Sequence, residues 1–186
     1  ACKATLHLID NGCRRLALLG GPNALNMVKL RKHGYINALH ERNIAVEPKL
    51  VKCDKITLQK AMTNTDRLLS LPQPPDGILA LNDTLLFAAM KAIKRRGLRI
   101  PDDVSLIGFT DVEYTEDVNP PLSAVMDQSY KMGEAACEIL INQIKGAKKA
   151  EHRIIPTILK IRESSLKKGN REIADGGEDN HSEKIK

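Results

Sequence analysis

The sequence has 186 residues, of which 42% are hydrophobic and 28% charged, the composition of an ordinary soluble globular domain. No stretch approaches the ~18 consecutive apolar residues of a membrane-spanning helix, so the sequence excludes such a helix and we expect a cytoplasmic protein without membrane partners. The net charge of +6 invites a nucleic-acid interpretation, but the basic residues are scattered and tryptophan is absent, so charge alone predicts no such site.

Apolar residues alternate between helical and strand spacing from the start of the chain to Phe109. The sequence predicts helices over residues 4–10, 26–41 and 58–69 and short buried strands over residues 16–19 and 50–52. In the second helix, Met27, Leu30, Gly34 and Ala38 form the expected buried stripe, with Tyr35 and Leu39 beside it. A glycine inside a helix costs about 1 kcal/mol relative to alanine, so Gly34 indicates close packing against the sheet.

The central stretch, residues 78–111, has the pattern of a β-α-β unit. An apolar run, ILAL, ends at Asn82-Asp83, an amphipathic helix follows as far as Gly97, and a second apolar run covers residues 104–109. Continuous apolar runs joined by a crossover helix indicate parallel strands covered on both faces. Ligands of such sheets bind outside the carboxyl ends of the strands. Asn82-Asp83 and Thr110-Asp111 are therefore candidate binding residues.

Beyond Phe109 the pattern changes. A polar loop over residues 111–119 leads to a short strand over residues 122–125 and an amphipathic helix over residues 132–144. A late strand over residues 152–161 is interrupted by Pro156, and residues 164–186 are polar without an apolar period, which predicts a disordered tail. Because parallel crossovers are right-handed, the whole pattern predicts an α/β fold with a doubly wound parallel sheet.

Five segments in a fixed order carry a family resemblance. They are HLIDNGCRRLALLGGP, KLRKHGYINAL, ND with a helix ending in RRG and RIPDDVSLIGFTD, then NPPLSAV, and finally MGEAACEILINQI. From residue 1 to residue 163 the chain resembles the effector-binding half of the lac-repressor (LacI/GalR) family of bacterial transcription regulators. The resemblance implies the C-terminal subdomain of a type I periplasmic-binding-protein-like fold over residues 1–126. It also implies a hinge crossover, a helix of the N-terminal subdomain and a return strand over residues 127–163.

The same resemblance implies which residues bind the effector. They are Arg31, Asn82, Thr110, Asp111 and, at the hinge, Asp127. An arginine offers a planar fork of donors and an amide both donates and accepts, which suits a sugar, so we expect a carbohydrate effector. Two simpler interpretations stay open. Arg31 could be a solvated helix residue, and Asn82 could simply cap the helix that begins near Asp83. Alternatively, Asp83 caps this helix and Asn82 faces the cleft.

A second surface is expected to join two copies of the protein. Phe87 lies off the buried stripe of its helix, and Tyr114 and Val118 lie in a polar loop, so together they could form an exposed apolar patch. We interpret this patch as part of a homodimer interface. Alternatively, Phe87 packs into the core.

Enzyme, metal and cofactor chemistry have little support in the sequence. No GxSxG elbow or HExxH motif occurs, and Cys2, Cys13, Cys53 and Cys137 are too far apart for a zinc-binding pair. The chain starts at Ala1 inside an apparent helix, so we expect an upstream part. The family resemblance implies that this part contains a DNA-binding helix-turn-helix and that the protein is a homodimer. The sequence therefore predicts the sensor part of an operator-binding regulator. An exported sugar-binding protein and a small flavodoxin-like enzyme are the alternatives.

Overall fold

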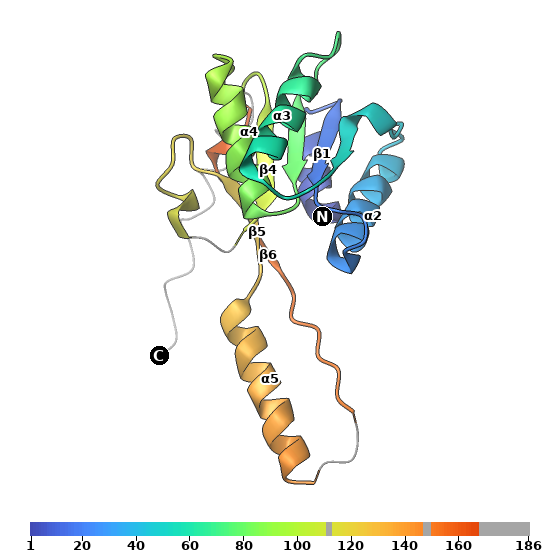
Figure 1. Ribbon diagram of the computed structural model, residues 1–186, viewed down its shortest axis with the longest axis vertical. Helices are drawn as coiled ribbons and strands as arrows, with labels where there is room; N and C mark the ends of the chain where they lie inside the picture. The colour runs from blue at the N-terminus through green and yellow to red at the C-terminus, as the bar shows by residue number, and fades with distance from the viewer. Residues whose placement is uncertain (111–112, 147–149, 168–186) are drawn as a thin grey trace, which may run out of the picture.

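A parallel sheet with helices on both faces forms the body of the protein (Figure 1). The computed structural model describes residues 1–110, 113–146 and 150–167. Within these ranges six strands lie in the order β2-β1-β3-β4-β5-β6. All neighbouring pairs are parallel except the last, in which β6 runs antiparallel to β5. The predicted doubly wound α/β fold is confirmed, with one antiparallel strand at its edge.

The elements follow the predicted order with small shifts at their ends. The helices are α1 (Cys2–Asp10), α2 (Asn26–Glu41), α3 (Leu58–Leu69), α4 (Asp83–Arg95) and α5 (Ser129–Ile144). The strands are β1 (Leu16–Gly20), β2 (Val51–Cys53), β3 (Gly77–Ala80), β4 (Ser105–Phe109), β5 (Ser123–Met126) and β6 (Ile158–Lys160). Three 3₁₀ turns complete the described chain, namely η1 (Pro48–Leu50), η2 (Glu113–Thr115) and η3 (Glu163–Ser165).

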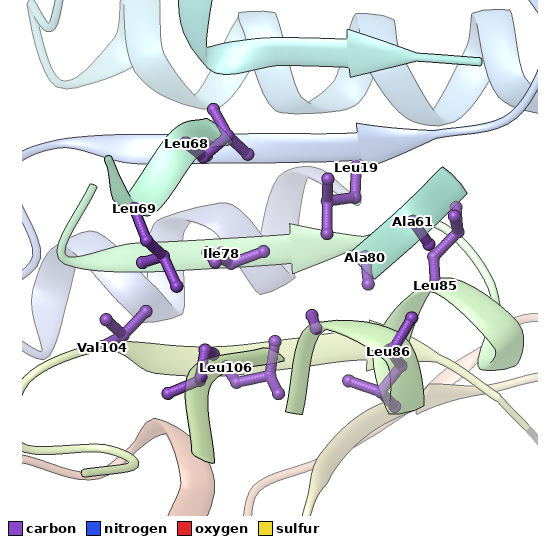
Figure 2. Close-up of a cluster of buried hydrophobic side chains, with 14 of the residues drawn as sticks. Leu19, Ala61, Leu68, Leu69, Ile78, Ala80, Leu85, Leu86, Val104 and Leu106 are labelled. Carbon is purple, nitrogen blue, oxygen red and sulfur yellow. The ribbon is translucent and has the colours of Figure 1, made fainter. Parts of the chain in front are cut away.

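Two hydrophobic layers separate the sheet from its helices. Successive side chains of a strand point to opposite faces, so Ala17 and Leu19 of β1 face α3 and α4, whereas Leu16 and Leu18 face α1 and α2. Figure 2 shows the first layer, in which Leu86 lies among Ala80, Leu106 and other buried side chains. Gly108 lets α4 approach β4 closely, because a Cβ atom there would lie 2.9 Å from the methyl carbons of Leu86.

The buried stripe of α2 differs from the predicted one. Val28, Tyr35, Ala38 and Leu39 are buried, whereas Met27 and Leu30 are exposed. The close contact of Gly34 is made with the first residues of α1 and not with the sheet, since a Cβ atom at Gly34 would lie 3.0 Å from the Cβ of Ala1. Helix α2 thus packs on two neighbours at once. Its sheet-facing stripe lies beside the stripe that the periodicity indicated.

Helix α5 leaves the body of the protein. Together with the extended chain before β6 it forms an arm that projects from the end of β5 (Figure 1). None of its 16 residues is buried, although Met132, Leu140, Ile141 and Ile144 are large apolar residues. The late strand is shorter than predicted, because β6 begins at Ile158, beyond Pro156, which has no N–H group to donate to a sheet.

The ordered chain extends past the predicted start of the tail at residue 164. Ser164 and Ser165 are fully buried in η3, where the Ser164 hydroxyl donates to the carbonyl oxygen of Leu106 over 2.6 Å. The Ser165 hydroxyl lies 2.6 Å from the Ser123 hydroxyl and 2.7 Å from Nε2 of His7. These hydrogen bonds hold the C-terminal segment against the amino end of the sheet, which overrides the polar composition that indicated disorder. The rest of the predicted tail, 168–186, lies outside the described residues.

The burial of His7, which lies beside Ser165, should make stability depend on pH. Burial lowers the pKa of His7 below its ordinary value of 6.5, and the nearby Asp10 opposes this shift. The unfolded chain then binds a proton at a higher pH than the folded chain, so stability falls as the pH drops through about 6.5. Urea unfolding of the protein between pH 7.5 and pH 5.5 should show a steeper loss of stability than His7→Gln shows. Equal slopes for His7→Gln and the wild type would contradict this role of His7.

Candidate functional site

The carboxyl ends of β3, β4 and β5 meet at one edge of the sheet. The register pairs Ala80 with Gly108 and Phe109 with Val125, so the residues that directly follow these strands lie near one another. Thr110 directly follows β4, Asp127 directly follows β5, and Asn82 lies two residues beyond the end of β3. Arg31 reaches the same edge from the second turn of α2. The structure therefore gathers residues from four elements at the edge where the sequence placed the binding site.

Arg31 is held by three groups at this edge. Its Nη1 donates to the carbonyl oxygen of Leu81 over 2.7 Å, and its Nη2 lies 3.4 Å from Oδ2 of Asp127. The guanidinium carbon also lies 3.9 Å from the centroid of the Phe109 ring, a cation–π contact. Only 15% of the side chain is exposed. The alternative of a solvated helix arginine is therefore wrong.

Burial and charge act in opposite directions on Arg31. Burial lowers the pKa of its guanidinium, and the negative charge of Asp127 raises it again. An arginine stays protonated in either case. The side chain of Asp127 is 44% exposed, so this carboxylate borders the solvent while the guanidinium beneath it is largely covered.

Asn82 caps α4. Its Oδ1 accepts a hydrogen bond from the backbone N–H of Leu85 over 2.9 Å, which satisfies one of the free donors at the start of the helix. Asp83 instead accepts from its neighbour, the N–H of Thr84, over 2.6 Å. The expectation that Asp83 caps the helix is therefore wrong. The cap uses only Oδ1, so the amide nitrogen of the half-buried Asn82 is not required for it.

Of the two predicted site residues after β4, the structure describes Thr110 and not Asp111. Thr110 is 7% exposed, and its backbone N–H donates to the carbonyl oxygen of Val125 over 3.1 Å, which fixes the end of β4 against β5. Asp111 lies outside the described residues. Sequence reasoning missed two groups at this edge, the Phe109 ring and the Leu81 carbonyl. Both directly precede predicted site residues at the end of a strand, and this position could have indicated them.

The expected dimer patch is a stacked pair of aromatic rings. The rings of Phe87 and Tyr114 lie 5.2 Å apart between centroids with an angle of 30° between their planes. Tyr114 is 52% exposed, whereas Phe87 and Val118 are half-buried and pack against the core layer of α3 and α4. The alternative that Phe87 packs into the core is therefore correct in part. One side of its ring contacts the core and the ring also stacks on Tyr114.

The described residues, 1–110, 113–146 and 150–167, contain neither a candidate metal site nor a membrane-spanning helix. In these ranges no three His, Cys, Asp or Glu side chains are grouped so that they could hold a metal ion. No helix of the described chain combines the length and the apolar character needed to cross a bilayer.

Comparison with known proteins defines the class. The model of the family described as "Periplasmic binding protein-like domain" matches residues 5–165. The chain belongs to this family. Its relatives within the family are transcription regulators, and the resemblance to LacI-family regulators is confirmed.

Three of these relatives show how much of a regulator the chain represents. The HTH-type transcriptional repressor CytR of Escherichia coli (strain K12) is 31% identical over 146 residues, which are 78% of this chain and 43% of CytR. The structure of a LacI-family regulatory protein from Chloroflexus aggregans matches with a TM-score of 0.84 and 31% identity, over 88% of this chain and 59% of that one. A sugar-binding LacI-family regulator from Escherichia coli, complexed with phosphate, matches with a TM-score of 0.80 and 29% identity, over the same shares. The chain thus spans less than half the length of CytR.

Proposed function

We propose that this chain is the effector-sensing part of a LacI-type transcription regulator and that its effector is a carbohydrate. The site around Arg31 carries this proposal, because a guanidinium fixed by Leu81, Phe109 and Asp127 is positioned before any ligand arrives. Arg31, Asn82, Thr110 and Asp127 would contact the effector, and Asp111 follows Thr110 in the chain. A similar regulator from Escherichia coli is described as sugar-binding, which supports the ligand class. The whole protein acts in the cytoplasm, and its chemistry is binding and not catalysis.

The arm supports a second part of the proposal. The large apolar residues of α5 are exposed in the described chain, and the relatives extend well beyond the matched region. Residues 127–163 would cross through a hinge and add α5 to an N-terminal subdomain, which would cover this apolar face. The effector would then bind in the cleft between the two subdomains, and the change in their relative position would alter operator affinity.

Operator binding tests the proposal. The full-length regulator should bind one DNA sequence selectively through a helix-turn-helix, and a sugar that binds near Arg31 should change that affinity by about fivefold or more. Residues 1–186 alone should show only weak, salt-sensitive attraction to DNA. Electrophoretic mobility shift assays with and without a panel of neutral sugars check both statements. Selective, salt-resistant DNA binding by residues 1–186 would overturn the proposal.

We also propose that the regulator is a homodimer that uses the Phe87 patch. Phe87→Glu would place a charge beside an aromatic ring at the contact, and an unpaired charge in an interface costs several kcal/mol. We expect at least a hundredfold weaker association of the full-length protein in analytical ultracentrifugation. Lys91→Glu, at an exposed position one turn further along α4, is the charge control and should leave the dimer intact. A Phe87→Glu variant that folds and stays dimeric would remove this patch from the interface.

A further inference from the structure

We propose that Asp127 determines the charge of the effector, so that the site accepts uncharged hydroxylated molecules and rejects carboxylated or phosphorylated ones. This inference takes one thing from the proposed function, namely that the natural ligand is a carbohydrate. The selection against anions is a property of the two charged side chains and is measurable without the natural effector.

The geometry around Arg31 leaves little attraction for an anion. A lone guanidinium is the side chain best suited to hold a carboxylate or a phosphate, because its planar fork matches two oxygens. Here Asp127 already lies 3.4 Å from Nη2, the Leu81 carbonyl occupies Nη1, and the Phe109 ring covers one face of the group. An anion that approached the remaining donors would lie within a few ångströms of the Asp127 carboxylate. The anion and the Asp127 carboxylate would then repel each other at this edge of the sheet, where the guanidinium is largely shielded from water.

The same pair of side chains suits a hydroxyl group. A hydroxyl can accept a hydrogen bond from Arg31 and donate one to Asp127, which no carboxylate or phosphate oxygen in its ionised form can do. The amide of Asn82, at the same edge, can donate to a further hydroxyl. A neutral molecule with neighbouring hydroxyl groups therefore pairs with both charges, whereas an anion pairs with one and is opposed by the other.

Inorganic phosphate is the probe. The protein is labelled with ¹³C-arginine, and phosphate is titrated while the Cζ signal of Arg31 is followed by NMR; the Arg31→Lys variant identifies the signal by its loss. Removing one unit charge that lies a few ångströms away near a protein surface is worth about tenfold or more in affinity. We expect Asp127→Asn to bind phosphate at least about tenfold more tightly than the wild type. Asp117→Asn, which removes an exposed carboxylate from the loop before β5, is the matched control and should behave as the wild type.

Phosphate affinities of the wild type and Asp127→Asn that agree within about twofold, including no binding by either, would overturn the inference. The same titration with glucose and glucuronate, and with galactose and galacturonate, asks whether the selection extends to sugars. A relative gain for the acid in Asp127→Asn supports the inference. If Asp127→Asn gains phosphate affinity and no sugar binds either protein, charge selection stands and the carbohydrate effector of the proposed function is wrong.

Discussion

Replacing Leu86 by alanine should lower the free energy of unfolding by about 2–5 kcal/mol, the usual cost of removing a fully buried leucine side chain. Leu86 is 0% exposed and packs directly on Gly108 of β4, so the backbone of the sheet forms one wall of the space that the change would leave. A sheet held on both faces cannot move in to fill it. Urea unfolding of the wild type and the variant measures the difference.

Leu30→Ala is the matched control. It removes the same atoms from another helix, but Leu30 is 65% exposed, so its loss should change the free energy of unfolding by less than about 0.5 kcal/mol. This control also tests the corrected stripe of α2. Equal losses for Leu30→Ala and Leu86→Ala would show that α2 buries the stripe indicated by its periodicity.

Replacing Arg31 by alanine should weaken effector binding by about tenfold to hundredfold, because ligand hydroxyls in a partly dry cleft lose their donors at about 1–3 kcal/mol each. The change also leaves the Leu81 carbonyl and the Asp127 carboxylate without the guanidinium that now contacts them. Calorimetric titration of the full-length protein measures the affinity. Lys29→Ala, which removes an exposed cation from the preceding turn, should bind as the wild type does.

Asn82 is better tested with aspartate than with alanine. Asn82→Ala would remove the cap of α4 and cost about 1 kcal/mol of stability, so a weaker affinity would have two explanations. Aspartate also caps helices, and Asn82→Asp keeps the cap while it replaces the amide donors by a negatively charged acceptor. Wild-type affinity in both Arg31→Ala and Asn82→Asp would show that the effector binds elsewhere.

The fold could be predicted because its central strands, β1, β3 and β4, are buried on both faces. Continuous apolar runs such as residues 78–81, separated by helices that end at glycines with positive φ such as Gly97, allow few arrangements other than a doubly wound sheet. The stripe of α2 could not be predicted from periodicity. Two apolar stripes lie side by side on this helix, and only the positions of α1 and the sheet decide which one is buried.

The site was predictable where a residue's position follows from a strand end. Thr110 and Asp127 directly follow β4 and β5, and Asn82 lies two residues beyond the end of β3, so a correct sheet places them at one edge. Which atoms Arg31 contacts depends on its side-chain path across the sheet edge to Leu81 and Phe109. No spacing in the sequence encodes that path. The buried serines of η3 escaped detection for a similar reason, because their partners Leu106 and Ser123 lie some 40 to 60 residues away in the chain.

The most direct test of the account is a crystal structure of the full-length protein with the neutral sugar that binds most tightly in the titrations. We expect a sugar ring at the carboxyl edge of β3, β4 and β5, with hydroxyl groups within about 3.2 Å of the Arg31 guanidinium and of the Asn82 amide. One hydroxyl should lie between Arg31 and Asp127. A sugar bound elsewhere, with Arg31 still contacted only by Leu81, Phe109 and Asp127, would contradict it.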